Sequence, residues 1–399
     1  MALRVAALVL VAALSVGTAS AGQLTLSSEI QASFYPRDPI GRDALDSGIR
    51  GWVSLEFERA LGKSLDFDGD VVVYESKGRR AVVDGEAKLV WRGANAELAG
   101  GLLRERWGRF VDSALDPLGA ANTPFSLVGP EQRLGQPAVR ATAFLDHISL
   151  DVYALVGHRP QPLPGSEGRF GFGVPTTDVV RRGHLAEQAL AVRISSTQPE
   201  LDWSAHIYGG LNRRPTFLPR FTADAQLSSV DAVYTEILQF GGELETTRAD
   251  WRFLAEGFGR TAALDVTGRK RTYASIAAAA EYQRLGAFDG AYNVIPRFEF
   301  MADTRGDRAD VPFASALRAG LRVASTRLRP VQFDMAYSFD WAFRGHGVLG
   351  SIEKTLAESP AVKVGFQTTA FFAGSTRSVL DIWEDDLELF GSVRVELSW

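Results

Sequence analysis

The sequence predicts an all-β fold: a transmembrane, antiparallel, up-and-down β-barrel of about eighteen strands, with sixteen as the alternative. Three observations lead to this prediction. Apolar and polar residues alternate with period 2 in many segments, short turns alternate with long loops, and no apolar run beyond residue 21 is long enough for a membrane-spanning helix. The 39 glycines and 10% aromatic residues suit a chain of many strands and turns.

Residues 1–21 are predicted to be a cleaved signal peptide, which leaves residues 22–399 as a single barrel domain. Arg4 precedes an apolar run from Val5 to Val16, and Ala19-Ser20-Ala21 forms an A-x-A cleavage pattern. An apolar core of about a dozen residues is too short to cross about 30 Å of hydrocarbon as a helix. We therefore expect an exported protein whose mature chain begins at Gly22.

Strand-like alternation begins at the mature N-terminus, where Leu24, Leu26 and Ile30 share one face and polar residues share the other. The next three strands carry carboxylates opposite their apolar faces: Glu56 and Glu58, then Asp66, Asp68 and Asp70, then Asp84 and Glu86. The three aspartates also match the first ligands of a calcium loop. The sixth and twelfth positions of that loop are Val71 and Lys77 instead of Gly and Glu, so we interpret the aspartates as barrel wall.

The connections between the predicted strands alternate in length. Tight turns are Gly62-Lys63, Gly93-Ala94-Asn95, Asp146 to Ser149, Thr197 to Glu200, Thr247 to Asp250, Leu285 to Gly290, Thr326 to Arg329 and Ala357 to Pro360. Long loops are Pro36 to Gly48, Gly108 to Leu134, His158 to Glu187, Asn212 to Glu236, Arg260 to Arg271, Asp303 to Phe313 and Gly374 to Asp386, with short exceptions at Ser76 to Arg79 and Trp341 to Gly347. Short turns on one rim and long loops on the other are typical of outer-membrane barrels with both termini on the short-turn side.

Two further features bear on the strands. Pro296 predicts a bulge in the strand from Tyr292 to Ala302. Seven of the eight tryptophans fall on two levels, as interfacial girdles would require: Trp91, Trp203, Trp251 and Trp399 on the short-turn side, and Trp52, Trp107 and Trp341 on the opposite side.

Composition and motifs exclude several functions. A net charge of −5 gives no basic surplus, so no nucleic-acid partner is expected. The chain has no cysteine, which excludes disulfides, thiolate metal sites and haem attachment. The five histidines are scattered, and no P-loop, G-x-S-x-G or H-E-x-x-H motif is present. We therefore predict no enzyme activity and no cofactor, and we interpret His206, which has Asp202 nearby in the sequence, as a hydrogen-bonded wall residue.

Charges of both signs fall on the strand faces opposite the apolar residues. Ionisable groups at membrane depth are unfavourable unless they face water or each other, so these faces predict a wet, polar lumen. The predicted lumen wall comprises Glu56, Glu58, Asp66, Asp68, Asp70, Asp84, Glu86, Arg140, Arg193, His206, Glu243, Glu245, Arg252, Glu256, Arg297, Glu299, Arg318, Arg322 and Lys363.

The connection from Gly108 to Leu134 is predicted to fold into the lumen and narrow it. Its apolar Leu118 and Phe125 need burial, and Pro117 and Pro124 stiffen its path. Opposed charges across such a constriction would create a transverse field that sets solute preference. These charges are Asp112, Asp116, Glu131, Arg104, Arg106, Arg109, Arg133 and Arg140. The alternative is a surface loop that covers the rim.

The ending VRVELSW resembles the assembly signal of Gram-negative outer-membrane barrels, an alternating strand closed by Phe or Trp. Val395, Leu397 and Trp399 carry this resemblance. The stretch from Trp107 to Gly165, with its W-G, L-G-Q-P, L-D and P-G pattern, also resembles a poorly characterised family of Gram-negative outer-membrane proteins. The resemblance implies a porin-like barrel in the bacterial outer membrane, in contact with membrane lipid and with the barrel-assembly machinery.

Two functions are compatible with these features. The leading hypothesis is a channel through which small hydrophilic solutes diffuse along a charged, water-filled lumen. The alternative is a barrel that acts as a scaffold or sleeve in an outer-membrane export or transport complex, holding a lipoprotein or a periplasmic partner. A homo-oligomer is compatible with either, and the mixed-sign wall serves both because charged side chains solvate a permeant or bind a plug.

Overall fold

The computed structural model describes residues 22–34, 48–76, 79–110, 120–121, 133–160, 174–181, 187–224, 226–309, 315–358, 361–372 and 386–398. The predicted signal peptide and Trp399 lie outside these residues. In the described part of the chain, regular structure is almost entirely β-strand, with one 3₁₀ turn, η1 (Gly306–Arg308). Within the same ranges, no helix is long and apolar enough to cross a membrane.

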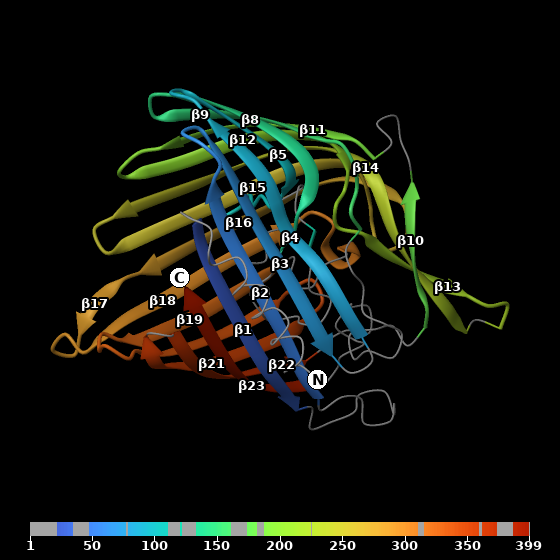
Figure 1. Cartoon of the computed structure of the whole chain (residues 1–399). Helices are drawn as coiled ribbons and strands as arrows, with labels where there is room; N and C mark the ends of the chain where they lie inside the picture. Colours follow the sequence, from blue (N-terminus) through green and yellow to red (C-terminus); the bar gives the residue numbers. More distant parts are fainter. Residues whose placement is uncertain are drawn as a thin grey trace.

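Among the described residues, eighteen strands follow one another around a ring, each antiparallel to its neighbours (Figure 1). The first seven are β1 (Gly22–Phe34), β2 (Gly48–Ala60), β3 (Leu65–Ser76), β4 (Arg79–Arg92), β5 (Ala96–Leu103), β8 (Gln136–Leu145) and β9 (Ile148–Leu155). The next five are β11 (Ala189–Thr197), β12 (Leu201–Leu211), β14 (Leu227–Arg248), β15 (Trp251–Leu264) and β16 (Lys270–Tyr282). The last six are β18 (Tyr292–Asp303), β19 (Ala316–Ser325), β20 (Val331–Asp340), β21 (Gly345–Glu358), β22 (Ala361–Phe372) and β23 (Asp386–Ser398).

The ring closes because the first and last strands pair with each other. β1 pairs with β2 on one side and with β23 on the other, with Thr25 opposite Ser398 and Phe34 opposite Leu389. A closed ring leaves no strand edge without a backbone partner, which is the condition for placing a sheet in lipid. Within the described ranges, the strands that pair around this ring number eighteen, as predicted.

The two rims differ as the sequence predicts. Short turns join β2 to β3, β4 to β5, β8 to β9, β11 to β12, β14 to β15 and β19 to β20, and the described ends of the chain lie on the same rim, since Gly22 pairs with Arg59 beside the first of these turns. The opposite rim carries the longer connections and is called the long-loop rim below.

Two connections predicted to be long loops consist mostly of strand, and the predicted loops Gly108 to Leu134 and His158 to Glu187 contain short strands. β15 runs on to Leu264 and returns in β16 at Lys270, with a register shift between Arg260 and Ala263 and a positive φ of 60° at Ala262. The segment predicted as the loop Asn212 to Glu236 holds β13 (Thr216–Phe221) and the first half of β14. Backbone pairing extends both hairpins into the predicted loops.

The first half of β14, β13 and β10 form a small sheet outside the ring (Figure 1). The first half of β14 pairs antiparallel with β13 and parallel with β10 (Thr176–Arg181), while its second half pairs with β12 and β15 inside the ring. Two smaller additions are the pair β6 (Ala120–Ala121) with β7 (Arg133–Leu134), and β17 (Arg284–Ala287), which pairs with β18.

Two local predictions about register are corrected. The β18–β19 ladder runs through Pro296 without a shift, and on the other side Pro296 lies between the end of pairing with β16, at Arg297, and the start of pairing with β17, at Val294. No register shift occurs at Pro296 itself. The shift in this strand lies closer to its start, where Val294 pairs with Arg284 and Tyr292 pairs with Ala287. A register shift does occur between β3 and β4: Glu86 pairs with Asp70, but Asp84 pairs with Val71. Asp84 and Glu86, which simple alternation places on the same face, are therefore separated by an irregularity in the ladder.

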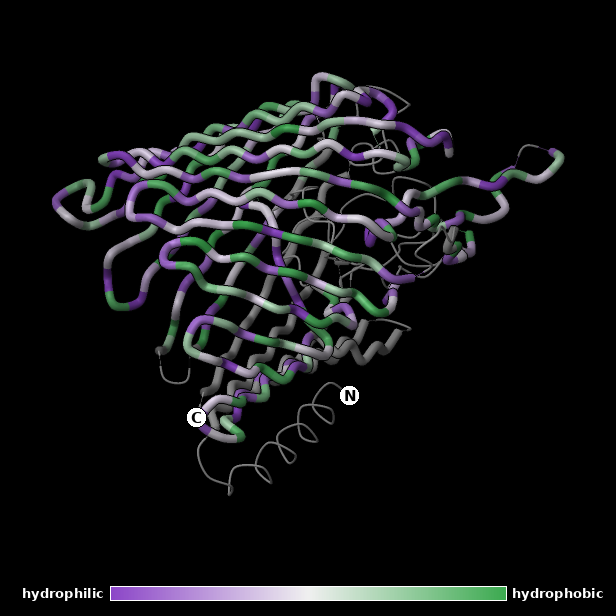
Figure 2. The backbone as a smooth tube through the Cα atoms, turned by 90° about the horizontal axis from the view of Figure 1, so that it is seen from above, coloured by the Kyte–Doolittle hydropathy of each residue, from purple (hydrophilic) through white to green (hydrophobic). Residues whose placement is uncertain are grey.

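The wall has an apolar outer face and a polar inner face. Along β11, Leu190 and Val192 are exposed on the outside while Arg193 is half-buried inside, and along β16, Ile276 is 54% exposed while Glu281 is buried. Figure 2 shows the same alternation as hydrophobic and hydrophilic segments succeeding each other along the strands. This is the reverse of a water-soluble protein and suits a barrel surrounded by lipid.

Candidate functional site

A row of five arginines lies on the inner face of the barrel. Four are on strands and one is on a segment that enters the ring, and we call them the arginine row: Arg109, Arg193, Arg252, Arg297 and Arg318. Strand register forms it, because Arg252 on β15 stands opposite Glu281 on β16, and Glu281 stands opposite Arg297 on β18.

Each arginine on a strand of the row is held by carboxylates. The Nη1 atom of Arg252 lies 3.0 Å from Glu281, and that of Arg297 lies 2.6 Å from the same residue. Arg297 also pairs with Glu299, whose other oxygen lies 3.3 Å from Arg318. Two further pairs complete the row: Arg252 with Glu245 at 2.7 Å, and Arg193 with Glu243. Charge-assisted hydrogen bonds of this kind fix guanidinium groups in place.

The guanidinium groups are more exposed than the carboxylates that hold them. The side chain of Arg252 is 31% exposed and that of Glu281 is 9% exposed. The side chain of Arg318 is 24% exposed and that of Glu299 is 6% exposed. A molecule inside the ring would therefore meet the arginines first.

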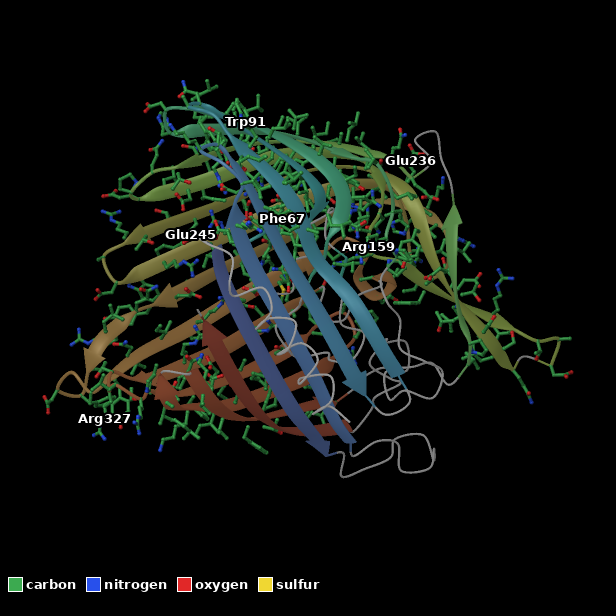
Figure 3. All side chains as sticks on the ribbon, in the orientation of Figure 1. Phe67, Trp91, Arg159, Glu236, Glu245 and Arg327 are labelled. Carbon is green, nitrogen blue, oxygen red and sulfur yellow. The ribbon has the colours of Figure 1, made fainter. Side chains whose placement is uncertain are left out.

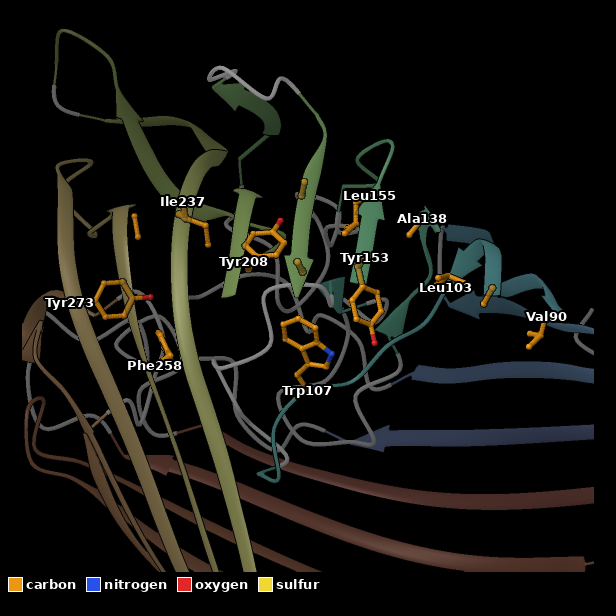
Figure 4. Packing of buried hydrophobic residues seen from close by; sticks show 14 residues of the cluster. Val90, Leu103, Trp107, Ala138, Tyr153, Leu155, Tyr208, Ile237, Phe258 and Tyr273 are labelled. Atoms are coloured by element: carbon orange, nitrogen blue, oxygen red, sulfur yellow. The ribbon is translucent and has the colours of Figure 1, made fainter. Parts of the chain in front are cut away.

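Residues 104–110, which follow β5, enter the ring and are called the inward segment below. Trp107 is fully buried, with its ring centroid 5.5 Å from that of Tyr153 and 4.8 Å from that of His206. The guanidinium of Arg193 lies 5.8 Å from the Trp107 ring, close enough for a cation–π contact. Figure 4 shows Trp107 among inward side chains of the wall, which include Leu103, Tyr153, Tyr208, Ile237, Phe258 and Tyr273.

The position of Trp107 corrects the predicted girdle. Trp91, Trp251 and Trp341 are exposed near strand ends, as that prediction requires, but Trp107 lies inside the ring. Its place in the sequence, just after a strand, is the same for a girdle residue and for the first residue of an inward loop. Only the three-dimensional path of the chain separates the two.

Two wall carboxylates anchor the backbone of the inward segment. The N–H of Gly108 donates to Glu243 Oε2 at 3.2 Å, and the N–H groups of Arg109 and Phe110 donate to Glu256 Oε2 at 2.9 and 3.4 Å. The guanidinium of Arg109 adds ion pairs with Glu245 at 3.1 Å, Glu243 at 3.5 Å and Asp202 at 3.7 Å. Phe110 packs against Leu254 and Ala279. The segment thus connects β5 to the facing wall formed by β12, β14, β15 and β16.

The structure distributes the residues predicted for the constriction over two groups. Arg104 pairs with Asp70 at 2.5 Å, and Arg140 pairs with Glu105 at 2.6 Å and with Glu97, all on the β3 to β8 side. Arg109 belongs to the β12 and β14 side, and Arg106 reaches the carbonyl of Phe110 at 3.5 Å. Arg133 is described only in its backbone, which pairs with Ala121, while Asp112, Asp116 and Glu131 lie outside the described residues.

The predicted wall residues on β2 and β3 form an acidic inner face. Asp66 pairs with Arg92, and Asp68 lies 3.8 Å from Lys88. Glu56 and Glu58 stand opposite Asp70 and Asp68 in the register and are exposed. Arg322 lies on β19, the strand that carries Arg318 of the arginine row. It pairs with Asp334 at 2.6 Å, and its side chain is 55% exposed. Among the described residues, no three acidic or histidine side chains are arranged to hold a metal ion.

His206 does not pair with Asp202, the neighbour considered for it in the sequence. Its Nε2 lies 2.9 Å from the amide nitrogen of Gln239. The carbonyl of that amide accepts from Arg260 at 2.8 Å, so the amide nitrogen must donate and His206 Nε2 must accept. His206 is therefore a neutral packing residue beside Trp107. The assembly residues Val395 and Leu397 lie on β23, opposite Ser28 and Leu26 of β1.

Sequence reasoning missed three carboxylates of the site. Glu281 binds Arg252, and Glu97 and Glu105 both bind Arg140. The sequence pattern did not predict any of the three as a wall residue. For Glu281 the pattern was present, since it follows Ala277 and Ala279 on one face of β16, but small residues on both faces hid the alternation.

The barrel is similar to solved structures of outer-membrane porins. OccK11 (OpdR) of Pseudomonas aeruginosa aligns with a TM-score of 0.55 at 9% identity, covering 95% of this chain and 96% of that chain. OccK2 (OpdF) of the same organism, solved in complex with glucuronate, aligns with a TM-score of 0.55 at 11% identity over 94% and 98% of the two chains. OccD3 (OpdP) aligns with a TM-score of 0.52 at 10% identity over 95% and 92%. No protein-family model and no curated protein sequence matches this chain.

Proposed function

We propose that this protein is a channel of the bacterial outer membrane through which small hydrophilic solutes diffuse, and that it favours solutes bearing a carboxylate or another anionic group. The observation that carries the proposal is the arginine row on the inner face of a ring whose outer face is apolar. An apolar outer face suits lipid, and a charged inner face suits water and a polar permeant.

The geometry of the row supports the anionic preference. A guanidinium binds a carboxylate through two parallel hydrogen bonds, and the row offers several in succession along one wall. Each already has a carboxylate partner, so a permeant would exchange weak contacts from one arginine to the next rather than remain bound. OccK2, which shares the fold, is the neighbour solved with glucuronate, a sugar acid.

The inward segment supports a narrowed path. It is fixed to the wall by Glu243 and Glu256, and it brings Arg109 into the row. Its continuation, with Asp112 and Asp116, is the part that we propose completes the constriction. An acidic edge facing the arginine row would orient a polar solute as it passes.

Reversal potentials in a salt gradient across a planar bilayer test the proposal. The parent should show stable conductance steps with anion preference and block by glucuronate. The double variant Arg252→Gln, Arg297→Gln should shift selectivity toward cations and weaken the block severalfold. Arg220→Gln is the matched control, because Arg220 pairs with Asp231 on the sheet outside the ring and should conduct like the parent. Silent bilayers with a co-purifying partner would favour the sleeve function instead.

A further inference from the structure

A buried guanidinium joins four segments at the long-loop rim. Arg213 follows β12 and is 0% exposed. Its Nη1 donates to the carbonyl oxygen of Gly157 at 3.0 Å and to Nδ1 of His158 at 2.8 Å, both after β9. Longer contacts of 3.5 Å reach Gln136 Oε1 at the start of β8 and the carbonyl oxygen of Glu187 before β11.

A second set of bonds fixes the same place. The side chain of Gln136 pairs with the backbone of Arg159, donating to its carbonyl at 3.2 Å and accepting from its N–H at 3.1 Å. Arg159 Nη1 donates to the carbonyl of Gly135 at 2.9 Å. We call Gln136, His158, Arg159 and Arg213 the rim latch. Figure 3 places Arg159 on the side of the molecule where β10 and the first half of β14 project, away from Glu245.

The charge state of the latch follows from its donors. A guanidinium only donates hydrogen bonds, so His158 Nδ1 must accept, and the imidazole is neutral with its proton on Nε2. Within the described ranges, no carboxylate forms an ion pair with Arg213, and its acceptors on the other three segments are neutral oxygens and this nitrogen. An added positive charge on His158 would therefore meet Arg213 with no anion between them.

The other side of His158 is closed by β14. The ring of Tyr234 packs edge-on against the imidazole with a centroid distance of 4.5 Å, and its side chain lies near Asp178 on β10. Tyr208 on β12 lies near Arg213, and its hydroxyl donates to the carbonyl oxygen of Leu211. Arg159 is the neighbouring cation on the segment of His158 itself. Among the described residues, the titratable and charged groups around His158 include two arginines, two tyrosines and, behind one tyrosine, Asp178. Glu187, whose carbonyl oxygen accepts from Arg213, lies at the same rim.

We propose that the rim latch is released by acid: protonation of His158 removes the acceptor of Arg213 and places two cations 2.8 Å apart in a buried space, so that residues 156–160 and 212–215 separate. Release loosens the long-loop rim at the entrance to the ring and raises conductance. The effect on conductance rests on the proposed channel function, whereas the separation of the two segments does not.

The pH window follows from the closed state. Burial, with Arg213 adding to it, lowers the pKa of His158 from 6.5 to about 4. A histidine released to solvent regains its ordinary pKa, so between pH 6.5 and about 4 only the released state takes up the proton. The ratio of released to closed molecules then rises about tenfold per pH unit, about 300-fold in all, and stays constant at lower pH.

Hydrogen exchange of the purified barrel at pH 7, 5.5 and 4, corrected for intrinsic rates, measures release directly. In the parent, amides of residues 156–160 and 212–215 should exchange faster as the pH falls through this window, and conductance should rise in parallel. In His158→Gln the amide oxygen still accepts from Arg213 and does not titrate, so both responses should be lost. His147→Gln, an exposed histidine beside Asp146 on the short-turn rim, is the matched control and should respond like the parent.

Arg213→Gln gives a second test should His158→Gln fail to fold, because it removes the opposing cation and should flatten the acid response. An identical acid response in either of these variants and in the parent, or no response of the parent in this window, would overturn the latch. If amide exchange depends on acid as expected but the protein gives no conductance in bilayers, the latch proposal stands and the channel proposal is contradicted.

Discussion

At the scale of one residue, Glu243 links the wall to the inward segment. One of its oxygens accepts from Arg193 and from Ser204, and the other accepts from the N–H of Gly108 and lies 3.5 Å from Arg109. Its side chain is 2% exposed. A carboxylate buried to this degree is stable only when donors surround it, and here the donors come from three parts of the chain.

The two faces of a strand predict opposite outcomes for neighbouring substitutions. Met335 on β20 is 49% exposed on the outer face, so Met335→Arg places a guanidinium in lipid and should destabilise the barrel by about 2 to 4 kcal/mol. Gln332→Arg, on the inner face of the same strand, places it beside Asp334 and should fold normally. Heat-modified gel mobility in a urea series measures both. A greater loss for Gln332→Arg would mean that the faces of β20 are reversed.

At the scale of elements, alternation predicts the strands because their two sides meet different solvents, and this leaves a period of 2 in the sequence. The same rule predicts the inner face, and so Arg193, Arg252, Arg297 and Arg318. It does not predict how strands slide relative to one another, which decides that Glu281 stands between two arginines. It also carries no information on where a loop travels, which is why Trp107 was placed in a girdle.

The β15–β16 turn, predicted as a loop, is closed by Asp265. Its carboxylate accepts from the N–H and hydroxyl of Thr267 at 2.9 and 2.6 Å, from the N–H of Arg269 at 3.1 Å and from Arg271 at 3.0 Å. Burial alone would raise the pKa of Asp265, but these hydrogen bonds lower it to about 2.

The folded-state pKa of Asp265 lies below its ordinary 3.8, so its contribution to stability is present above pH 3.8 and is lost as the pH falls toward 2. Amide exchange of residues 265–269, corrected for intrinsic rates, should accelerate severalfold across that interval in the parent. Asp265→Asn should exchange at the faster rate at every pH. A turn in the parent that exchanges equally at pH 5 and pH 2 would contradict this assignment.

At the scale of the whole molecule, the ring depends on its last strand. Deleting Val395 to Trp399 removes the partners of β1 from Thr25 to Ser28 and leaves an open sheet edge in the membrane. We expect the truncated chain to be degraded or to accumulate in the periplasm, as measured by surface labelling and cell fractionation. Trp399→Glu should act in the same direction and Trp399→Phe should not. Normal surface levels of the truncated chain would show that closure does not need these residues.

The pairing of β1 with β23 also sets the order in which the molecule can form. Thr25 and Ser398 are about 370 residues apart, so this contact has nearly the greatest sequence separation the chain allows. The other seventeen neighbouring pairs join strands close in sequence and can form as hairpins while the chain is still incomplete. One edge of β1 stays unpaired until β23 is available, and such an unpaired edge is a site for aggregation. Assembly is therefore expected to proceed as a growing open sheet, with closure as the last and slowest step.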